Sequence, residues 1–355
     1  MNNSTRKVMV NKLFAVGSFV MLTITCVLAS DGVEDFKAIL ASKVEQAGKE
    51  NATVVKGKDG WLFFVPELRH LSVGTFWGDA AAKVSKATSP TAADPLPAIL
   101  DFKAQLDRAG IALLVVPVPA KAAIYPEKIV DGAVNSASAR LDASDAEFIE
   151  LLKQKGLNVI DLAPIFIKYR SEHPDDLLYS REDTHWSGNG IRVAADAITD
   201  EVSKAKWFAG LKRTKYSAST GDAKVVGDLA SMLQDPKPGP EAVTLTQVKD
   251  PGGTLVASSR QSPLVLLGDS HSLIYSIGDD MLASGSGLPE NLALKLGFAP
   301  DVVAVRGSGA TPARVNLTRR ADNMAGKEIV VWCFTVREFT EGQGWRKVPV
   351  IRPGS

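Results

Sequence analysis

The chain has 355 residues, of which 45% are hydrophobic and 23% charged, and its formal net charge at pH 7 is +1. This composition is typical of a globular protein with one large or two ordinary domains and an apolar core of its own. The near-neutral charge and the lack of a basic run in the sequence give no indication of nucleic-acid binding. The two cysteines, Cys26 and Cys333, and the four histidines lack the spacing of a disulfide framework or a metal site.

The N-terminus has the pattern of an export signal. Residues 1–12 carry three basic side chains and no acidic one, and residues 13–29 are uncharged and mostly apolar. Val27 and Ala29 suit positions −3 and −1 of a cleavage site. The apolar run also reaches the lower limit of length for a membrane span. We therefore expect residues 1–29 to be a signal peptide or an N-terminal membrane anchor, and the rest of the chain to be exported.

The exported part begins with a predicted helix. Residues 30–50 carry apolar side chains at helical spacing, which predicts an exposed helical stalk between the membrane and the domain. We expect that domain to cover residues 51–345. Residues 54–68 predict a hairpin, because two apolar runs flank a Gly-Lys-Asp-Gly turn.

Helices and strands alternate through most of the domain. A helix predicted over residues 96–109 ends at Gly110, and the apolar run at 111–119 is typical of a parallel strand buried on both faces. Further helices are predicted over residues 142–155, 163–171, 189–205, 289–298 and 310–323, and further strands over residues 157–162, 263–268, 301–305 and 328–336. Residues 205–262 predict an irregular excursion with one strand near 241–248. The alternation predicts an α/β fold, a three-layer α/β/α sandwich around a parallel sheet.

Three of the predicted strands end in polar or charged residues. In an open parallel sheet, ligands bind beyond the carboxyl ends of the strands. The residues that follow these strands are Asp269–Ser272, Arg306–Gly309 and Arg337–Glu338. We therefore expect them to border one site.

Ser270 lies at a turn that suits a nucleophile. Gly268 ends its strand and permits a tight turn, and residues 273–282 predict a helix directly afterwards. A serine at such a turn is exposed, and the helix N-terminus directs N–H groups towards it, as in a nucleophile elbow. Alternatively, Asp269 or Ser270 only caps the helix.

Asp183 and His185 are the best candidates to activate this serine. A histidine takes the proton of a serine hydroxyl, and a carboxylate on its other ring nitrogen fixes the tautomer and stabilises the imidazolium. Alternatively, this pair belongs to a surface loop with a capping aspartate. The competing histidines are weaker candidates: His70 and His173 lack this context, and the side chain of His271 is expected to point away from that of its neighbour Ser270.

These motifs together resemble a known family. Gly-Asp-Ser-His-Ser at 268–272 resembles the first motif of the SGNH hydrolase superfamily, in which this serine is the nucleophile. Most of that superfamily has the serine first and an Asp-x-x-His motif last, whereas here the triad order is permuted and the spacer is one residue. The permuted order with Asp-Thr-His-Trp at 183–186 resembles the periplasmic alginate O-acetyltransferase family of AlgJ and AlgX, with AlgJ the closer of the two. GKDGWLFF at 57–64 and PVPAKAAIYPEKI at 117–129 extend the resemblance to roughly residues 53–340.

The resemblance implies a fold, an activity and a set of residues. It implies an SGNH-hydrolase-like sandwich in which Ser270 is the nucleophile, His185 the base and Asp183 its orienting carboxylate. The implied activity is periplasmic transfer of acetyl groups to hydroxyls of an exported, alginate-like polysaccharide, with no cofactor and no metal. A membrane-bound O-acyltransferase would supply the acetyl group, and an uncleaved N-terminus would anchor the chain in the inner membrane.

The same mechanism needs donors for an oxyanion. The Ser270 N–H and the loop at 306–309, which includes Gly307, are the candidates. Arg306 is expected to contact either an anionic sugar or a surface acid, and Lys121 and Tyr125 either to line the cleft or to pack inside the protein. Two other functions fit the sequence: a carbohydrate esterase or deacetylase with the same triad, and a non-catalytic glycan-binding component of an export complex.

Overall fold

We describe a computed structural model that covers residues 32–130, 140–233 and 238–352. The predicted signal or anchor at 1–29 lies outside these residues. Within them, no helix is both long enough and apolar enough to cross a membrane.

A five-stranded parallel sheet forms the centre of the domain. Its strand order is β4-β3-β9-β7-β8. The strands are β3 (Ala112–Val118), β4 (Asn158–Val159), β7 (Leu264–Gly268), β8 (Asp301–Ala304) and β9 (Ile329–Thr335). Every residue of β9 is buried, which explains its continuous apolar sequence, since a central strand has helices on both of its faces. Val331 of β9 pairs with Leu114 on one side and Leu266 on the other, so the strand ends lie level.

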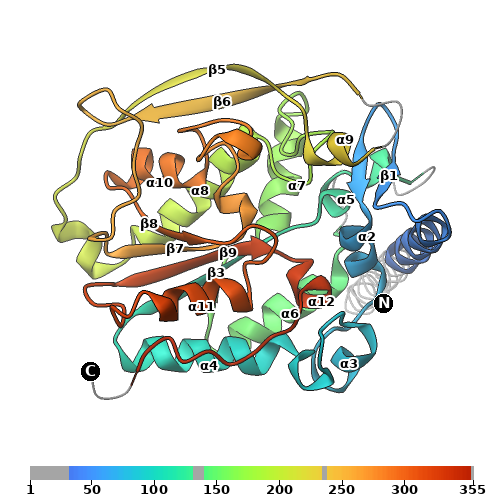
Figure 1. Ribbon diagram of the computed structural model, residues 1–355, viewed down its shortest axis with the longest axis horizontal. Coiled ribbons are helices and arrows are strands. Elements are labelled where there is room, and N and C mark those ends of the chain that lie inside the picture. Colours follow the sequence, from blue (N-terminus) through green and yellow to red (C-terminus); the bar gives the residue numbers. More distant parts are fainter. Residues whose placement is uncertain (1–31, 131–139, 234–237, 353–355) are drawn as a thin grey trace, which may run out of the picture.

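Helices cover both faces of this sheet (Figure 1). One face carries α7 (Leu162–Glu172), α8 (Gly188–Val202) and α10 (Leu288–Leu296). The other carries α4 (Pro95–Arg108), α6 (Ala143–Gln154) and α11 (Thr311–Arg319). The three-layer α/β/α prediction is confirmed.

The N-terminal segment packs on this domain. Residues 32–49 are helical, and Phe36 and Leu40 of this helix are fully buried in the same core as the sheet. The prediction of an exposed stalk is therefore wrong for these residues. An apolar stripe at helical spacing predicts a helix but does not show which surface the stripe packs against. The predicted hairpin is present as β1 (Val54–Lys56) and β2 (Leu62–Phe64), and α2 (Val65–Ser72) follows it.

The region predicted as irregular contains a long hairpin. The strand predicted near 241–248 is β6 (Glu241–Lys249), and it pairs in antiparallel fashion with a second strand, β5 (Ser217–Val225). The sequence missed β5 because nearly all of its side chains are exposed, so they show no apolar alternation. A short helix, α9 (Asp228–Met232), lies between the two strands in the chain.

The helix predicted after Ser270 is absent from the described structure. Only a 3-10 turn, η5 (Ser270–Ser272), forms there, and residues 273–287 follow as turns with one further 3-10 turn, η6 (Asp279–Met281). Tyr275, Gly278 and Gly285 have positive φ angles of 58°, 78° and 71°, which no helix accommodates. The remaining short elements are η1 (Gly78–Ala80), α3 (Ala81–Val84), η2 (Pro90–Ala92), α5 (Lys121–Ile124), η3 (Pro126–Lys128), η4 (Lys206–Gly210) and α12 (Glu338–Glu341).

Candidate active site

One cavity lies at the carboxyl end of the sheet and has a volume of about 390 Å³. Ser270 after β7, Arg306 and Gly307 after β8, and Arg337 and Glu338 after β9 all line it. These three strand ends therefore border one cavity. The cavity is also lined by His185 and Thr184, by Asp228 and Glu341, and by the apolar side chains of Phe64, Pro66, Met232 and Met281.

The turn that carries Ser270 is held tightly in place. A Cβ on Gly268 would lie 2.2 Å from the backbone oxygen of Cys333, so only glycine fits where the strand passes into the turn. The carboxylate of Asp269 accepts hydrogen bonds from the backbone N–H of His271 at 2.9 Å and of Thr335 at 2.8 Å. Asp269 is therefore the cap of this turn, and the hydroxyl of Ser270 is left for the cavity.

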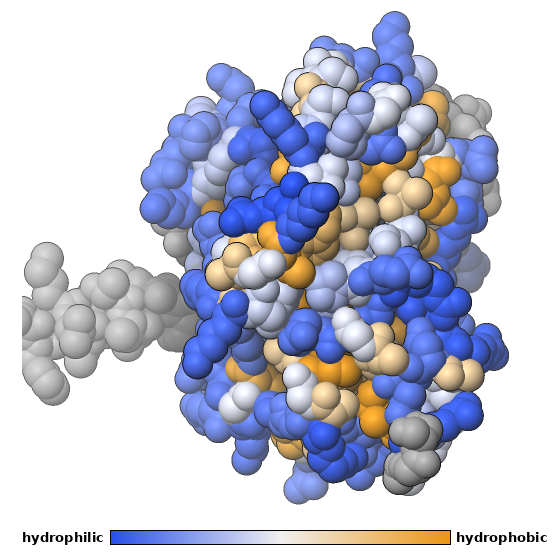
Figure 2. Space-filling model, turned by 90° about the vertical axis from the view of Figure 1, so that its left-hand side faces the viewer, coloured by the Kyte–Doolittle hydropathy of each residue, from blue (hydrophilic) through white to orange (hydrophobic). Residues whose placement is uncertain are grey.

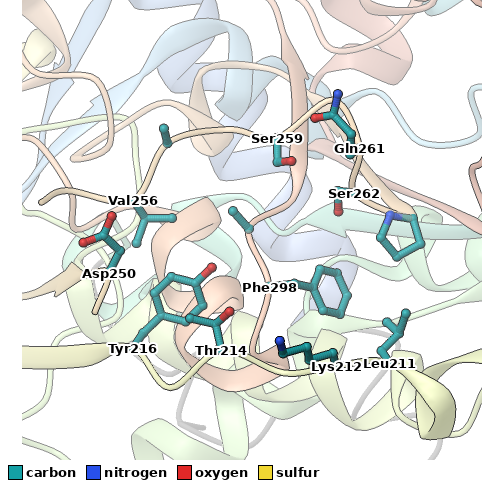
Figure 3. Close-up of a pocket in the computed structure, with 13 residues that line it drawn as sticks. Leu211, Lys212, Thr214, Tyr216, Asp250, Val256, Ser259, Gln261, Ser262 and Phe298 are labelled. Atoms are coloured by element: carbon teal, nitrogen blue, oxygen red, sulfur yellow. The ribbon is translucent and has the colours of Figure 1, made fainter. Parts of the chain in front are cut away.

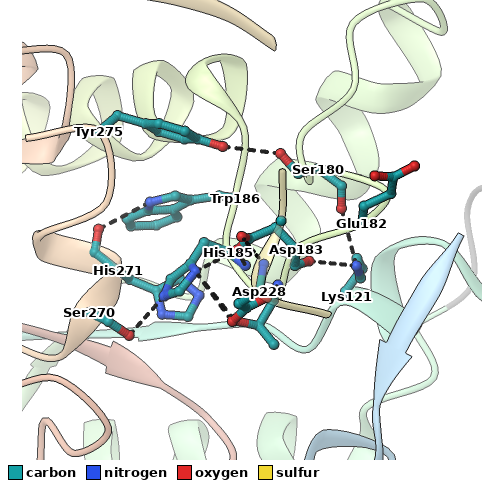
Figure 4. A network of polar contacts seen from close by, with 12 residues as sticks. Lys121, Ser180, Glu182, Asp183, His185, Trp186, Asp228, Ser270, His271 and Tyr275 are labelled. Atoms are coloured by element: carbon teal, nitrogen blue, oxygen red, sulfur yellow. Dashed lines mark hydrogen bonds and ion pairs between the residues drawn. The ribbon is translucent and has the colours of Figure 1, made fainter. Parts of the chain in front are cut away.

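Ser270, His185 and Asp183 form a hydrogen-bonded line (Figure 4). The Oγ of Ser270 lies 2.8 Å from Nε2 of His185, and Nδ1 of His185 lies 2.6 Å from Oδ1 of Asp183. Because Nδ1 faces a carboxylate, it carries the ring proton, and Nε2 is left to accept the proton of the serine hydroxyl. This is the geometry required of a nucleophile, a base and an orienting carboxylate.

The loop that carries His185 is also fixed by its own contacts. Tyr179 and Trp186 pair across its base, and Ser187 accepts the N–H of Gly190 and caps α8. The indole N–H of Trp186 donates to the backbone oxygen of His271 at 3.1 Å. The loops that carry His185 and Ser270 are therefore joined directly.

The surroundings of Asp183 and His185 shift the pKa values of the two side chains in opposite directions. Burial raises the pKa of Asp183, but the charge and hydrogen bonds of His185 outweigh this and lower its pKa to about 2. Burial lowers the pKa of His185, but Asp183 outweighs this and raises the pKa above its ordinary value. Asp183 is therefore ionised, and His185 is a stronger base than a free imidazole.

Asp228 is a third acidic residue at this site, and the sequence did not predict it. Its backbone N–H donates to Oδ2 of Asp183 at 2.8 Å, and its carboxylate accepts from the backbone N–H and the hydroxyl of Thr184 at 2.7 and 2.6 Å. One carboxylate oxygen lies 4.0 Å from Nδ1 of His185. Burial, and then the charge of Asp183, raise the pKa of Asp228. Its only sequence signal is an acidic residue at a helix start, which is common.

Asp183, His185 and Asp228 are also the one group of three metal-type ligands within the described residues. Zinc ligands at about 2.0–2.2 Å and tetrahedral angles stand about 3.3 Å apart. The Asp183 oxygen and the His185 nitrogen are 2.6 Å apart instead, which is a direct hydrogen bond. The arrangement fits proton transfer better than metal binding.

The other histidines of the described chain have different partners. His70 is buried between Asp145, 2.9 Å from Nε2, and the hydroxyl of Thr340, 3.0 Å from Nδ1, and lines no part of the cavity. His173 is exposed beside Tyr169. Nδ1 of His271 faces Asp269 at 3.2 Å.

His271 is therefore not a base for Ser270. Burial is the main reason that the pKa of His271 falls to about 4, so the ring is neutral at physiological pH. Its centre lies 4.7 Å from that of the His185 ring, which it helps to pack.

Two other predicted residues lie at the edge of the cavity. Arg306 pairs through Nη1 with Oδ2 of Asp280 at 2.5 Å, and its side chain is half exposed. Gly307 has a φ of +77° in the same loop. Lys121 and Tyr125, by contrast, are buried and do not line the cavity, so the alternative in which they pack inside the protein is the correct one.

A second cavity lies at the opposite end of the sheet, beside Pro263 just before β7, and has a volume of about 450 Å³ (Figure 3). Lys212, Tyr216, Gln261 and Phe298 line it, and its lining residues include no histidine or cysteine. Figure 2 views the molecule from this end, where apolar patches lie between hydrophilic side chains. This cavity is larger than the one at Ser270 but lacks a nucleophile–base pair.

Residues 54–336 match the family model described as "SGNH hydrolase-like domain, acetyltransferase AlgX". The chain belongs to this family. The match spans the sheet, the two loops of the site and the strand ends at 269–272 and 306–309, and it stops just before Arg337 and Glu338.

Curated relatives and solved structures agree with the family. The chain is 27% identical over 305 residues to the "Probable alginate O-acetylase AlgJ" of Pseudomonas aeruginosa, which covers 80% of this chain and 70% of the relative. It is 28% identical over 233 residues to the Pseudomonas putida protein of the same name, covering 62% of this chain and 54% of the relative.

Two solved structures share the fold. The O-acetyltransferase domain of Pseudomonas putida AlgJ matches with a TM-score of 0.60 at 24% identity, over 81% of this chain and 91% of that one. Pseudomonas aeruginosa AlgX matches with a TM-score of 0.57 at 18% identity, over 79% of this chain and 61% of that one. An SGNH-like α/β fold is therefore shown by the family and by structure.

Proposed function

We propose that this chain is a periplasmic O-acetyltransferase that moves acetyl groups onto hydroxyls of an exported, alginate-like polysaccharide. The observation that carries the proposal is the unbroken line from Asp183 through His185 to Ser270, at 2.6 and 2.8 Å, on the wall of a cavity. Curated relatives that bear the name alginate O-acetylase support the choice of reaction and of acceptor.

The first step acylates the enzyme. His185 Nε2 removes the proton of the Ser270 hydroxyl while Oγ forms a bond to the carbonyl carbon of the acetyl donor. The bond from that carbon to the leaving group then breaks, and the leaving group takes the proton from Nε2. Asp183 stabilises the imidazolium between the two events.

The second step transfers the acetyl group to the acceptor. A sugar hydroxyl gives its proton to Nε2 and attacks the ester carbon on Ser270, and Oγ leaves and recovers the proton. Both steps pass through an oxyanion that needs positioned donors. The backbone N–H of Ser270 and the loop of Arg306 and Gly307, which borders the same cavity, are the candidates.

The proposal also includes an anionic polymer as acceptor and a membrane enzyme as the source of acetyl groups. Arg306, half exposed at the cavity edge, is free to exchange its ion pair with Asp280 for the carboxylate of an anionic sugar, because exposed pairs of this kind are weak. The acetyl group would come from a membrane-bound O-acyltransferase. A purely glycan-binding role is less favoured, because binding requires no aligned serine, histidine and aspartate.

A labelling experiment tests the function. The protein is incubated with an activated acetyl ester, with and without alginate-type oligosaccharides, and both the protein and the sugars are analysed by mass spectrometry. We expect one acetyl group on the peptide that contains Ser270, its transfer to the oligosaccharide, and neither product with Ser270→Ala. If acetyl maps to another residue, the mechanism is wrong. If the label forms and only water accepts it, the chain is an esterase.

A further inference from the structure

Lys121 is a fully buried lysine whose ammonium is bound to the loop of the catalytic pair. Its Nζ donates to the backbone oxygens of Ser180 at 3.1 Å, Arg181 at 3.2 Å and Asp183 at 2.6 Å (Figure 4). The lysine begins α5, about sixty positions earlier in the chain. A single side chain therefore ties three carbonyl groups of this loop, at positions 180, 181 and 183, to the end of β3.

The three contacts require the charged form of the lysine. An ammonium has three N–H donors and no acceptor, and here each donor has one carbonyl partner. A neutral amine has only two N–H groups and could keep only two of these three contacts. The described residues place no carboxylate in direct contact with Nζ, so the backbone carbonyls are its main polar partners.

Aromatic rings and more distant carboxylates complete the surroundings of the ammonium. The rings of Trp61 and Phe63 lie 5.8 and 5.5 Å from Nζ, within the range of cation–π attraction. The charged groups that face it are Glu67 of α2, Asp183 and Glu182 of the loop, Asp228 of α9 and Glu241 of β6.

We call the Lys121 ammonium and its three carbonyl partners the clamp. Two of these carboxylates also accept hydrogen bonds from backbone N–H groups next to it. Glu67 accepts the backbone N–H of Lys121 at 3.1 Å. Glu241 accepts the backbone N–H groups of Arg181 and Glu182 at 3.0 and 3.3 Å. The loop is thus held by its carbonyls from one side and by its amides from the other.

Asp183 joins this clamp to the reaction. Its carbonyl takes the shortest of the three lysine contacts, and its carboxylate orients His185. We propose that Lys121 is a positioning residue for acyl transfer: its ammonium fixes the backbone at 180–183, and with it the alignment of Asp183 and His185 on Ser270, and loss of its proton loosens that alignment. The role in transfer rests on the function proposed above, whereas the effect on the Asp183–His185 hydrogen bond does not.

The charge of Lys121 is sensitive to pH in the physiological range. Burial lowers its pKa to about 8, and Glu67, Asp183, Asp228 and Glu241 only partly offset this. Between pH 8 and its ordinary pKa of 10.5, the unfolded chain binds this proton more readily than the folded chain does. As the pH rises through this window, the folded chain therefore becomes more stable relative to the unfolded chain through this group. A loss of activity near pH 8 that is caused by Lys121 would then not result from denaturation.

The wild-type protein gives the first test. The rate at which an activated acetyl ester acetylates Ser270 is measured from pH 5 to 10, with circular dichroism to confirm folding. We expect an alkaline fall of the rate with a midpoint near pH 8, in addition to the acidic fall caused by protonation of His185. A rate that stays constant from pH 7 to 10 overturns the proposal.

A matched pair of variants gives the second test. Lys327 is also buried and donates through Nζ to two backbone oxygens, those of Arg260 at 2.6 Å and Ser262 at 2.8 Å, but it lies at the amino end of the sheet and also pairs with Asp301 at 2.7 Å. Lys121→Met and Lys327→Met each remove a buried ammonium. We expect Lys121→Met to acetylate about 10²-fold more slowly with an almost unchanged KM, the loss typical of a small misplacement, and Lys327→Met to keep the wild-type rate. Equal rates in the two variants overturn the proposal.

A spectroscopic readout separates this proposal from the proposed function. The proton shared by His185 Nδ1 and Asp183 is followed by ¹H NMR as a strongly downfield signal. We expect it in the wild type, Ser270→Ala and Lys327→Met, and expect it to broaden or shift upfield in Lys121→Met and in the wild type above pH 8. A signal unchanged in Lys121→Met overturns the clamp even if Ser270 is acetylated. A protein that is never acetylated but shows this pattern refutes the proposed function and retains the clamp.

Discussion

The backbone N–H of Asp228 donates to the carboxylate of Asp183 across 2.8 Å, although 45 positions separate the two residues. Through this bond, the first turn of α9 holds the oxygen of Asp183 that does not face His185. The carboxylate of Asp228 in turn holds Thr184 by two bonds. A segment with no catalytic motif of its own therefore fixes the orientation of the loop that carries the base.

Substitutions at the two aspartates should have very different effects. Asp183→Asn keeps the shape but offers His185 an amide, which favours the wrong tautomer, so we expect the acetylation rate to fall on the order of 10⁴-fold. Asp228→Asn keeps the backbone N–H and removes a charge that is one-third exposed. The interaction of such a charge with His185 contributes about 1 kcal/mol, so we expect the acetylation rate to fall less than about tenfold. Rates of acetylation from an activated acetyl ester distinguish the two. Losses of equal size would show that Asp228 acts as more than a support.

The acidic side of the pH profile should report His185. Asp183 raises the pKa of His185 against the effect of burial, and Asp228 adds to the rise. Because only the neutral imidazole accepts the serine proton, the acetylation rate should fall as the pH drops through this raised pKa, with a midpoint above the ordinary value of 6.5. Asp228→Asn should move the midpoint to lower pH, since it removes a charge that stabilises the imidazolium. A midpoint below 6 in the wild type would contradict this electrostatic picture.

The parts of the fold that the sequence predicted are those with a strong local pattern. Buried strands such as β3 and β9 are continuous apolar runs, and their carboxyl ends indicated where Ser270 and Arg337 would lie. By contrast, β5 is exposed along most of its length and left no alternation to detect. The helix expected after Ser270 does not form because the backbone there turns through residues with positive φ.

The parts of the site that the sequence missed depend on long-range contacts. Asp228 and Lys121 are 45 and 62 positions from Asp183, and one atom of each contact belongs to the backbone: the N–H of Asp228 donates to the Asp183 carboxylate, and the Lys121 ammonium donates to the Asp183 carbonyl. Backbone atoms are the same in every residue, so no side-chain pattern marks the partner. The contact of Ser270 with His185 was predictable because the proposed chemistry restricts its side chains to a few residue types.

The N-terminus should direct the chain out of the cytoplasm. Residues 1–29 combine basic and apolar segments of the kind that export machinery recognises. Fusion of residues 1–50 to a reporter that is active only in the periplasm should give activity, and fusion of residues 30–50 alone should not. The size of the exported fusion, compared with its full length, shows whether residues 1–29 are removed or retained as an anchor. Equal reporter activity from the two fusions would place the export information elsewhere.

Gly268 should not tolerate a side chain. Its missing Cβ would meet the backbone oxygen of Cys333 at 2.2 Å and the hydroxyl of Ser272 at 2.6 Å, and the backbone cannot give way without moving β7 or β9. We expect Gly268→Ala to lower the free energy of unfolding by about 1–3 kcal/mol or more, as overpacking of a core does, and to displace Ser270 from His185.

Gly221 of β5 provides the control for Gly268. A Cβ there has no neighbour within 4 Å, and the residue is exposed, so Gly221→Ala should be neutral or slightly stabilising. Denaturant unfolding of both variants, with the acetylation rate of Ser270 measured alongside, checks both effects. If Gly268→Ala matched Gly221→Ala in stability and rate, close packing of the β7 end against β9 would not be what positions the nucleophile.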